Sequence, residues 1–332
     1  MTTMKKAAIL GERQAGLVER PIPQPKGREV LIKVMVAPMC TEYKAFLEGK
    51  PHDCLGHEAV GEVVEAAPGG LFRPGDRVVA MPLSGCGECD LCLAGDFIHC
   101  LSNPMQDSAM SQYIVKPEVS LRKIPDDLTY EQAALACCGL GASFGAMQKL
   151  SVAAYDTLLV TGLGPVGLGA VINAKYCGAR VIGVESNPYR IEVARRLGID
   201  EVVDPRDPDA LEKIKAMTGG IGPDCAVDCS GVPAAHRLCI DAVRRKGKVA
   251  FVGESHTETP VVVSRDLIRK GIHLIGSWHY NLNDFPKLAN VIRRSPEARH
   301  FVTHWFPMSR IQEALETSVS QQCAKIMLRP WE

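Results

Sequence analysis

Residues 157–167 read Thr157-Leu-Leu-Val-Thr-Gly-Leu-Gly-Pro-Val-Gly167, and this stretch decides the fold of the second half of the 332-residue chain. Its first five residues are apolar or β-branched, which predicts a buried strand. Gly162, Gly164 and Gly167 follow in the G-x-G-x-x-G spacing that permits a tight turn, the close approach of a pyrophosphate and packing of the next helix on the strand. The stretch therefore predicts a dinucleotide site; a glycine-rich turn without a ligand is the alternative.

An acidic residue closes the next strand-like segment, Arg180-Val-Ile-Gly-Val-Glu185. Glu185 follows Gly162 at close to the expected interval of about 20 positions. A carboxylate there accepts hydrogen bonds from ribose hydroxyls and repels a 2′-phosphate, so the sequence favours NAD over NADP. Arg190 keeps NADP as the alternative, because a nearby arginine could bind that phosphate.

Strand-like and helix-like segments alternate around this stretch. Strands are expected at 157–161, 180–185, 224–228 and 247–253, with helices from about Val166, over 190–197 and between the last two strands. This alternation predicts an α/β fold with a doubly wound parallel sheet. Residues 1–150 are β-rich instead, with expected strands at 29–37, 59–65 and 76–80. The expected domains are 1–150, 151–285 and a C-terminal segment, 286–332, that returns to the first domain.

Four cysteines form a C-x2-C-x2-C-x7-C cluster at Cys86, Cys89, Cys92 and Cys100. Close pairs of thiolates on a glycine-containing loop supply the tetrahedral shell that zinc prefers. A closed four-thiolate shell leaves no open position, so the sequence predicts a structural zinc lobe at about 84–102. Free thiols or two disulfides are the alternative.

Further soft ligands lie far apart in the sequence, at Cys40, in Gly56-His57-Glu58 and at Cys137-Cys138. A zinc with three protein ligands and one open position is what catalysis needs. The spacing by itself does not assemble these pieces, because a lone histidine is more often an ordinary surface or core residue. Two adjacent cysteines in an apolar helix are also more often packing residues.

Composition excludes several classes of function. The formal net charge is zero, with 38 basic and 38 acidic residues, which argues against a nucleic-acid or anionic-membrane partner. No apolar run approaches the roughly 18 residues of a transmembrane helix, and the N-terminus lacks a signal peptide's apolar core. The 13 cysteines are odd in number and scattered, as in a reducing compartment. We expect a cytoplasmic protein.

The ordered set of motifs resembles the zinc-dependent medium-chain dehydrogenase/reductases, the alcohol and polyol dehydrogenases. Cys40, Gly-His57-Glu58, Pro74-Gly-Asp-Arg-Val78, the four-cysteine loop and the glycine fingerprint carry the resemblance, which covers nearly the whole chain. It implies a GroES-like β-rich catalytic domain in two sequence pieces and a Rossmann domain between them. It also implies an NAD-dependent oxidoreductase with two zincs per chain, one catalytic and one structural, that acts on a secondary alcohol, polyol or sugar hydroxyl.

The resemblance also implies roles for individual residues. Catalytic zinc would be held by Cys40, His57 and Cys138, with Cys137 a weaker choice and Glu58 a neighbouring carboxylate or alternative ligand. Bound zinc would lower the pKa of the alcohol before hydride passes to nicotinamide. Val166, Val252 and Gly253 match positions beside the nicotinamide. Pro260-Val-Val-Val-Ser264 matches a strand that pairs across a dimer, which implies a homodimer or homotetramer.

The chain departs from the family where a hydroxyl relays the proton. The family pattern is Cys-x-Ser/Thr-Asp, whereas this chain reads Cys40-Thr41-Glu42-Tyr43-Lys44. If one residue is missing, Thr41 is the relay hydroxyl and Lys44 lies near the usual relay histidine. If the alignment has no gap, Glu42 takes the hydroxyl position. We favour Thr41 for its hydroxyl chemistry, with a helix-capping threonine as the competitor.

Two other functions stay open at this point. One is an NAD(P)-dependent reductase or multi-step enzyme that retains its cofactor and acts on a sugar or specialised metabolite. The other is a non-catalytic NAD-binding protein, which loss of the catalytic ligands would mark; all three ligand candidates are present. The identity of the alcohol is not decided by these residues.

Overall fold

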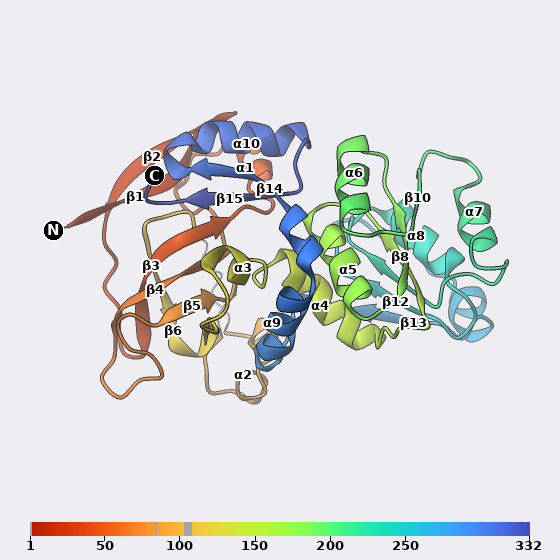
Figure 1. The fold of residues 1–332 in the computed structure, drawn as a ribbon, viewed down its shortest axis with the longest axis horizontal. Coiled ribbons are helices and arrows are strands. Elements are labelled where there is room, and N and C mark those ends of the chain that lie inside the picture. Colours follow the sequence, from red (N-terminus) through yellow and green to blue (C-terminus); the bar gives the residue numbers. More distant parts are fainter. Residues whose placement is uncertain (1, 84, 103–107) are drawn as a thin grey trace. The chain divides into compact units, whose positions relative to one another are not determined.

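The computed structural model describes residues 2–83, 85–102 and 108–332, so the first position of the predicted zinc lobe, residue 84, lies outside the described residues. The chain forms two compact units (Figure 1). Unit 1 comprises Met1–Cys138, Asn281–Arg293 and Val302–Glu332, and unit 2 comprises Gly139–Tyr280 and Arg294–Phe301. Within the described ranges, no helix has the length and apolar character that crossing a bilayer requires.

Unit 1 is built on β-sheets. A seven-stranded sheet has the order β14-β15-β3-β4-β5-β7, with β6 paired to β3, and β1 and β2 form a separate antiparallel pair. The strands are β1 (Thr3–Gly11), β2 (Gln14–Pro21), β3 (Glu29–Pro38), β4 (Ala59–Ala66), β5 (Arg77–Ala80), β6 (Tyr113–Pro117), β7 (Leu121–Lys123), β14 (Val302–Pro307) and β15 (Lys325–Arg329). The helical elements are α1 (Tyr43–Glu48), α2 (Asp90–Leu93), η1 (Phe97–His99), η2 (Glu118–Ser120), α3 (Tyr130–Ala134), η4 (Leu282–Asp284), α9 (Phe285–Arg294), η6 (Met308–Arg310) and α10 (Ile311–Ser320).

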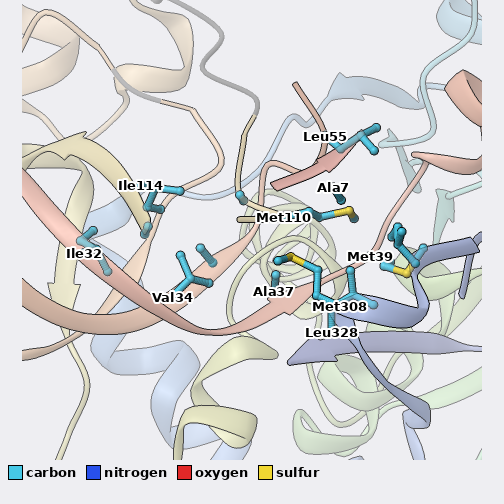
Figure 2. Packing of buried hydrophobic residues seen from close by; sticks show 14 of the residues in the cluster. Ala7, Ile32, Val34, Ala37, Met39, Leu55, Met110, Ile114, Met308 and Leu328 are labelled. Atoms are coloured by element: carbon cyan, nitrogen blue, oxygen red, sulfur yellow. The ribbon is translucent and has the colours of Figure 1, made fainter. Parts of the chain in front are cut away.

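The core of unit 1 joins sequence segments that are almost 300 residues apart. Figure 2 shows Val34 and Ala37 of β3 among the same buried side chains as Met308 and Leu328 from the C-terminal segment. Leu328 of β15 pairs with Ala37 of β3 in an antiparallel register. This apolar packing fixes β15 against the end of β3. It therefore also fixes the position of the residues that directly follow β3.

Unit 2 contains a six-stranded parallel sheet in the order β10-β9-β8-β11-β12-β13, as the alternating pattern predicts. The strands are β8 (Thr157–Thr161), β9 (Arg180–Val184), β10 (Glu201–Val203), β11 (Cys225–Asp228), β12 (Lys248–Phe251) and β13 (His273–Gly276). The helical elements are α4 (Gly139–Leu150), α5 (Pro165–Tyr176), α6 (Pro188–Arg196), α7 (Ala210–Ala216), α8 (Pro233–Ala242), the π-helix η3 (Val263–Ile268) and η5 (Pro296–His300).

The unit boundaries differ from the expected domain limits. Helix α4 was expected in the first domain, but it packs on α5 because Asn173 donates to the carbonyl of Leu140 and to Ser143 Oγ at 3.0 and 2.9 Å. The return to unit 1 begins at Asn281, whose side-chain amide donates to the carbonyl of Ala94 at 2.8 Å in the cysteine-rich loop. Such side-chain hydrogen bonds leave no trace in the pattern of apolar and polar residues, so the sequence pattern does not predict these boundaries.

The expected strand at Pro260–Ser264 is wrong at its last two residues, because the π-helix η3 begins at Val263. Residues 260–262 pair with no strand among the described residues of the single chain, and Val262 has an extended backbone (φ −94°, ψ 101°). The cause is Asp266, whose carboxylate accepts the N–H of Val262 at 2.9 Å while its own N–H donates to the Val262 carbonyl at 2.8 Å. These two hydrogen bonds turn the chain back on itself against its β-branched composition.

Candidate metal centres and cofactor turn

The four cysteines of the predicted lobe converge in unit 1. The sulfurs of Cys86, Cys89, Cys92 and Cys100 all lie within 4.8 Å of one another. Cys86 and Cys92 are 3.9 Å apart, as are Cys89 and Cys100. A tetrahedral site with zinc–sulfur bonds of about 2.3 Å separates its sulfurs by about 3.8 Å. The four thiols therefore fit a zinc ion without rearrangement.

The backbone around these cysteines leaves no space for bulkier residues. A side chain at Gly85 would lie 2.5 Å from the sulfur of Cys92, and one at Gly95, where φ is +87°, would lie 2.2 Å from Asn281 Oδ1. Backbone N–H groups of Glu88 and Cys89 lower the pKa of the Cys86 thiol to about 6, whereas burial raises that of Cys92 to about 12. Metal ligation removes protons from all four thiols.

A second cluster in unit 1 brings together Cys40, His57, Glu58 and Cys138, whose ligand atoms also lie within 4.8 Å of one another. The sulfurs of Cys40 and Cys138 are 3.7 Å apart, again close to the edge of a zinc tetrahedron. Two cysteines and one histidine make three soft ligands, which fit a zinc ion that keeps an open position.

Separate elements position the three soft ligands. Cys40 follows β3 by two residues, and the N–H of Met39 donates to the carbonyl of Ile326 in β15 at 2.9 Å. His57 comes just before β4, and Cys138 immediately precedes α4. The neighbouring Cys137 points elsewhere, since its thiol lies 3.9 Å from the carbonyl of Ala59. The cluster therefore contains Cys138 and not Cys137.

The two cysteines of this cluster differ in acidity. The hydrogen bond from the Cys138 thiol holds the pKa of Cys40 well below its ordinary value, against the effect of burial. The same bond, together with burial, raises the pKa of Cys138. Ionisation of one thiol therefore opposes ionisation of the other, because the two sulfurs are adjacent.

Glu42 orients the histidine. Its Oε1 lies 3.3 Å from His57 Nδ1, and its Oε2 accepts the N–H of Cys40 at 2.6 Å. Although burial opposes it, hydrogen bonds with Cys40 and Glu42 raise the pKa of His57 to about 11. A carboxylate on Nδ1 fixes the ring and leaves Nε2 for a metal.

Glu58 is held by Lys325. Both side chains are fully buried, and Lys325 Nζ lies 2.6 Å from Glu58 Oε1. The other carboxylate oxygen accepts the N–H of Cys138 at 3.0 Å. Burial raises the pKa of Glu58, opposed by the charge of Lys325, and the charge of Glu58 in turn raises the pKa of Lys325 despite its burial.

Lys325 and the role of Glu42 were not found from the sequence. The one available signal for Lys325 was a lysine among apolar residues in Ala324-Lys-Ile-Met-Leu328, which indicates a buried cation that needs an acidic partner. Of the predicted relay residues, Thr41 and Lys44 are exposed, whereas Glu42 is buried beside His57.

In unit 2, the glycine turn fits a pyrophosphate. Gly162 has φ of +79°, and a side chain at Gly167 would lie 1.8 Å from the Gly162 carbonyl oxygen. At Gly164, in contrast, a Cβ would meet no atom closer than Arg190 Nη1 at 4.0 Å. Gly162 and Gly167 are therefore required by the turn itself, and the space at Gly164 stays open in front of the N-terminus of α5.

Glu185 is buried beside this turn. Its Oε2 accepts the N–H of Leu163 at 2.9 Å, and its Oε1 accepts the N–H groups of Ser186 and Asn187 at 2.8 and 2.9 Å. A carboxylate accepts about four hydrogen bonds, so one acceptor position is left for a ribose hydroxyl. The Nε atom of Arg190 is buried without a hydrogen-bond partner among the described residues.

The predicted nicotinamide-side loop follows β12. The N–H groups of Val252 and Gly253 donate to the carbonyl of Asp228 at the end of β11, at 2.9 and 3.0 Å. A side chain at Gly253 would lie 2.2 Å from the nitrogen of Gly231, so glycine is required there. Val166 is half-buried in the first turn of α5. These residues lie at the carboxyl edge of the parallel sheet, where such sheets bind ligands.

Comparisons with known proteins agree with both halves of this description. A family model described as "Alcohol dehydrogenase GroES-like domain" matches residues 25–126, and one described as "Zinc-binding dehydrogenase" matches residues 165–294. A sorbitol dehydrogenase of Bacillus subtilis (strain 168) is 34% identical over an alignment of 350 positions, which covers 98% of this chain and 97% of that protein.

Solved structures have the same fold. The alcohol dehydrogenase TADH from Thermus sp. ATN1 superposes with a TM-score of 0.91 at 23% identity, over 98% of this chain and 99% of that one. An alcohol dehydrogenase (rspB) from E. coli CFT073, solved with NADH, has a TM-score of 0.87 at 24% identity, over 99% and 100% of the two chains. This chain therefore belongs to the zinc-dependent medium-chain alcohol and polyol dehydrogenase family, and it is an oxidoreductase that acts on alcohols or polyols.

Proposed function

We propose that this protein is an NAD-dependent dehydrogenase that reversibly oxidises a secondary alcohol, a polyol or a sugar hydroxyl. The observation that carries the proposal is the cluster of Cys40, His57 and Cys138, with their ligand atoms within 4.8 Å of one another. The polyol class is supported by the 34% identity to a protein named sorbitol dehydrogenase over nearly the full length of both chains.

Cys40, His57 and Cys138 would hold a catalytic zinc, and Cys86, Cys89, Cys92 and Cys100 a structural one, which gives two zincs per chain. Bound zinc supplies a Lewis acid that lowers the pKa of an alcohol. Glu42 keeps the imidazole of His57 oriented, and Lys325 keeps the carboxylate of Glu58 engaged. Both contacts support a site with three protein ligands and one position for substrate.

The hydroxyl of Thr41 would carry the substrate proton to solvent. Thr41 directly follows the ligand Cys40 and is exposed, whereas Glu42 is occupied by His57 and by the N–H of Cys40. A hydroxyl both donates and accepts hydrogen bonds, so it can pass on a proton without holding a charge. Lys44, also exposed, lies three residues further along the chain, in the first turn of α1.

NAD is the proposed cofactor, bound at the turn of Gly162, Gly164 and Gly167. The remaining acceptor position of Glu185 suits a ribose hydroxyl, and its negative charge opposes a 2′-phosphate. The unpartnered guanidinium nitrogen of Arg190 suits an oxygen of the ribose or the pyrophosphate. The solved relative that contains NADH shares this fold, which is consistent with the assignment.

We also propose a homodimer or homotetramer in the cytoplasm, with no nucleic-acid or membrane partner. Val261, Val262, Val263 and Ile268 form an exposed apolar surface on unit 2, and Ile268 is 72% exposed. An exposed apolar surface of this kind is typical of a contact between proteins. The zero net charge supports a protein with no nucleic-acid or membrane partner. The scattered free cysteines support a cytoplasmic location.

The test is a screen of secondary alcohols, polyols and sugars, each with NAD and with NADP, on zinc-loaded protein. We expect reduction of NAD by at least one polyol or secondary alcohol, and loss of that activity after treatment with a chelator. No activity with any alcohol, together with nicotinamide that stays bound through purification, would contradict the proposal and favour the retained-cofactor enzyme.

A further inference from the structure

A cavity of about 420 Å³ in unit 2 lies away from the glycine turn. Its lining includes residues just before β11, β12 and β13, namely Ile221, Val243 and Lys270. The glycine turn follows the end of β8, and all six strands of this sheet are parallel. The cavity therefore opens at the opposite edge of the sheet from the cofactor turn.

Five cations line this cavity, which we call the basic pocket: Lys215, Arg245, Arg265, Arg269 and Lys270. One carboxylate, Asp241, lies among them, and both of its oxygens already bind Arg237. Arg265 pairs with the buried Asp266, which also binds Arg237. Among the ion pairs of the described residues, none involves Lys215, Arg245, Arg269 or Lys270. A chain of zero net charge thus concentrates unpaired cations at one place.

Only some of the cations in the basic pocket cap the ends of helices. Lys270 Nζ donates to the carbonyls of Ile240 and Asp241, which end α8, and Arg245 donates to the carbonyl of Arg269. Cations at a helix C-terminus are stabilised by its dipole. Lys215 and the guanidinium of Arg269 have no such bond among the described residues. Burial, with the charges of Lys215 and Arg237 and against that of Asp241, lowers the pKa of Lys270 to about 8.

We propose that the basic pocket binds a small molecule that carries two or more neighbouring phosphate groups. Arginine presents its N–H groups as a fork that matches phosphate oxygens, and lysine adds a mobile point charge. The volume is within the range of small-ligand sites, about 300–1,000 Å³. Ile221, which is 70% exposed at the rim, offers an apolar surface to the organic part of such a ligand.

Pyrophosphate is the probe for this site, titrated by calorimetry at constant ionic strength into the zinc-loaded protein. Zinc content is measured before and after, because pyrophosphate can also chelate metal. Hydrogen exchange locates the binding: we expect added protection at residues 241–246 and 265–271. Arg245→Gln with Arg269→Gln should raise the Kd at least about tenfold, because each charge-assisted hydrogen bond contributes about 1.5 kcal/mol or more.

The matched control is Arg195→Gln with Arg196→Gln, which removes two exposed cations from the last turn of α6 in the same unit. It should leave the Kd within about twofold, since screened surface charges act weakly at a distance. The proposal is overturned if pyrophosphate does not bind, if it keeps its affinity in the Arg245/Arg269 variant, or if protection appears only at 162–167. Tighter binding of a single-stranded oligonucleotide would also overturn it, because the site would then be a nucleic-acid surface.

Discussion

The buried pair of Lys325 and Glu58 lies beside Cys138 in the candidate catalytic cluster. We predict that Lys325→Met lowers the free energy of unfolding by about 3–5 kcal/mol, because it leaves the Glu58 carboxylate buried without a cation. Urea unfolding of the zinc-loaded protein measures this. The exposed pair of Lys213 and Asp207 is the control, and Lys213→Met should leave the urea midpoint nearly unchanged, because water screens the pair.

A second variant separates the charge from the packing. Glu58→Gln combined with Lys325→Met removes both charges, so most of the lost stability should return. If Lys325→Met unfolds at the same urea concentration as the wild type, Lys325 does not neutralise Glu58. If the double variant is less stable than either single variant, the loss comes from packing.

The charge of Glu185 should decide between the two cofactors. Glu185→Gln keeps the shape and no longer repels a 2′-phosphate, although its single amide oxygen can replace only one of the two carboxylate oxygens that accept backbone N–H groups. We predict that the ratio of kcat/KM for NAD to that for NADP falls at least about tenfold, as for the removal of one charged contact. Glu201→Gln, on the neighbouring β10, should leave the ratio unchanged. An unchanged ratio in Glu185→Gln would mean that another residue selects the cofactor.

At the residue scale, the sequence did not predict contacts between residues that lie far apart along the chain. The family resemblance implied Cys40, His57 and Cys138 as the ligand set, which their spacing alone did not assemble. Glu42 and Lys325 have roles that depend on which atoms they reach after folding. Lys325 contacts a carboxylate 267 positions away, and only the pairing of β15 with β3 brings the two together.

At the scale of elements, the glycines of the turn between β8 and α5 have two different roles. Gly162 and Gly167 are required by the fold of the turn, whereas Gly164 leaves space for the ligand. Gly167→Ala should lower the free energy of unfolding by about 1–3 kcal/mol, because its Cβ would lie 1.8 Å from the Gly162 carbonyl oxygen. Gly164→Ala should cost less than about 1 kcal/mol, since the position is open and its φ is −68°. Yet Gly164→Ala should weaken NADH binding at least about tenfold, because the methyl group fills the space of the pyrophosphate.

Fluorescence titration of NADH and urea unfolding of both variants measure these effects. Equal NADH affinity for Gly164→Ala and the wild type would place the pyrophosphate elsewhere. Equal stability for Gly167→Ala would mean that α5 can move away from β8 at no cost.

Elements were predicted well where hydrophobic periodicity set them. The four strands expected in the parallel sheet, β8, β9, β11 and β12, fall within a residue or two of their expected limits, because burial on both faces gives continuous apolar runs. Strands β10 and β13 were not predicted. The expected strand at Pro260–Ser264 ends early, because two hydrogen bonds between Val262 and Asp266 begin η3 at Val263. The sequence placed α4 before the domain limit at residue 150, whereas α4 clusters with unit 2, in which Asn173 of α5 donates to Leu140 and Ser143.

At the scale of the whole molecule, we predict self-association through the exposed surface of Val261, Val262, Val263 and Ile268. Light scattering coupled to size exclusion should give two or four chain masses for the wild type. Val262→Asp should shift the protein toward one chain mass, because a carboxylate buried in an apolar contact has no partner. Leu101→Asp, at an exposed apolar residue of unit 1, is the control and should leave the mass unchanged. A wild type of one chain mass at micromolar concentration would contradict the prediction.

We predict that the chain holds two zincs in two separate clusters of unit 1, one open and one closed. Elemental analysis of protein purified without chelator measures them. The wild type and Cys54→Ala, which changes an exposed cysteine outside both clusters, should each contain about two zincs per chain. Cys40→Ala should contain about one, stay folded and lose turnover. About one zinc in all three proteins would contradict this prediction, because only the four-cysteine lobe would then bind metal.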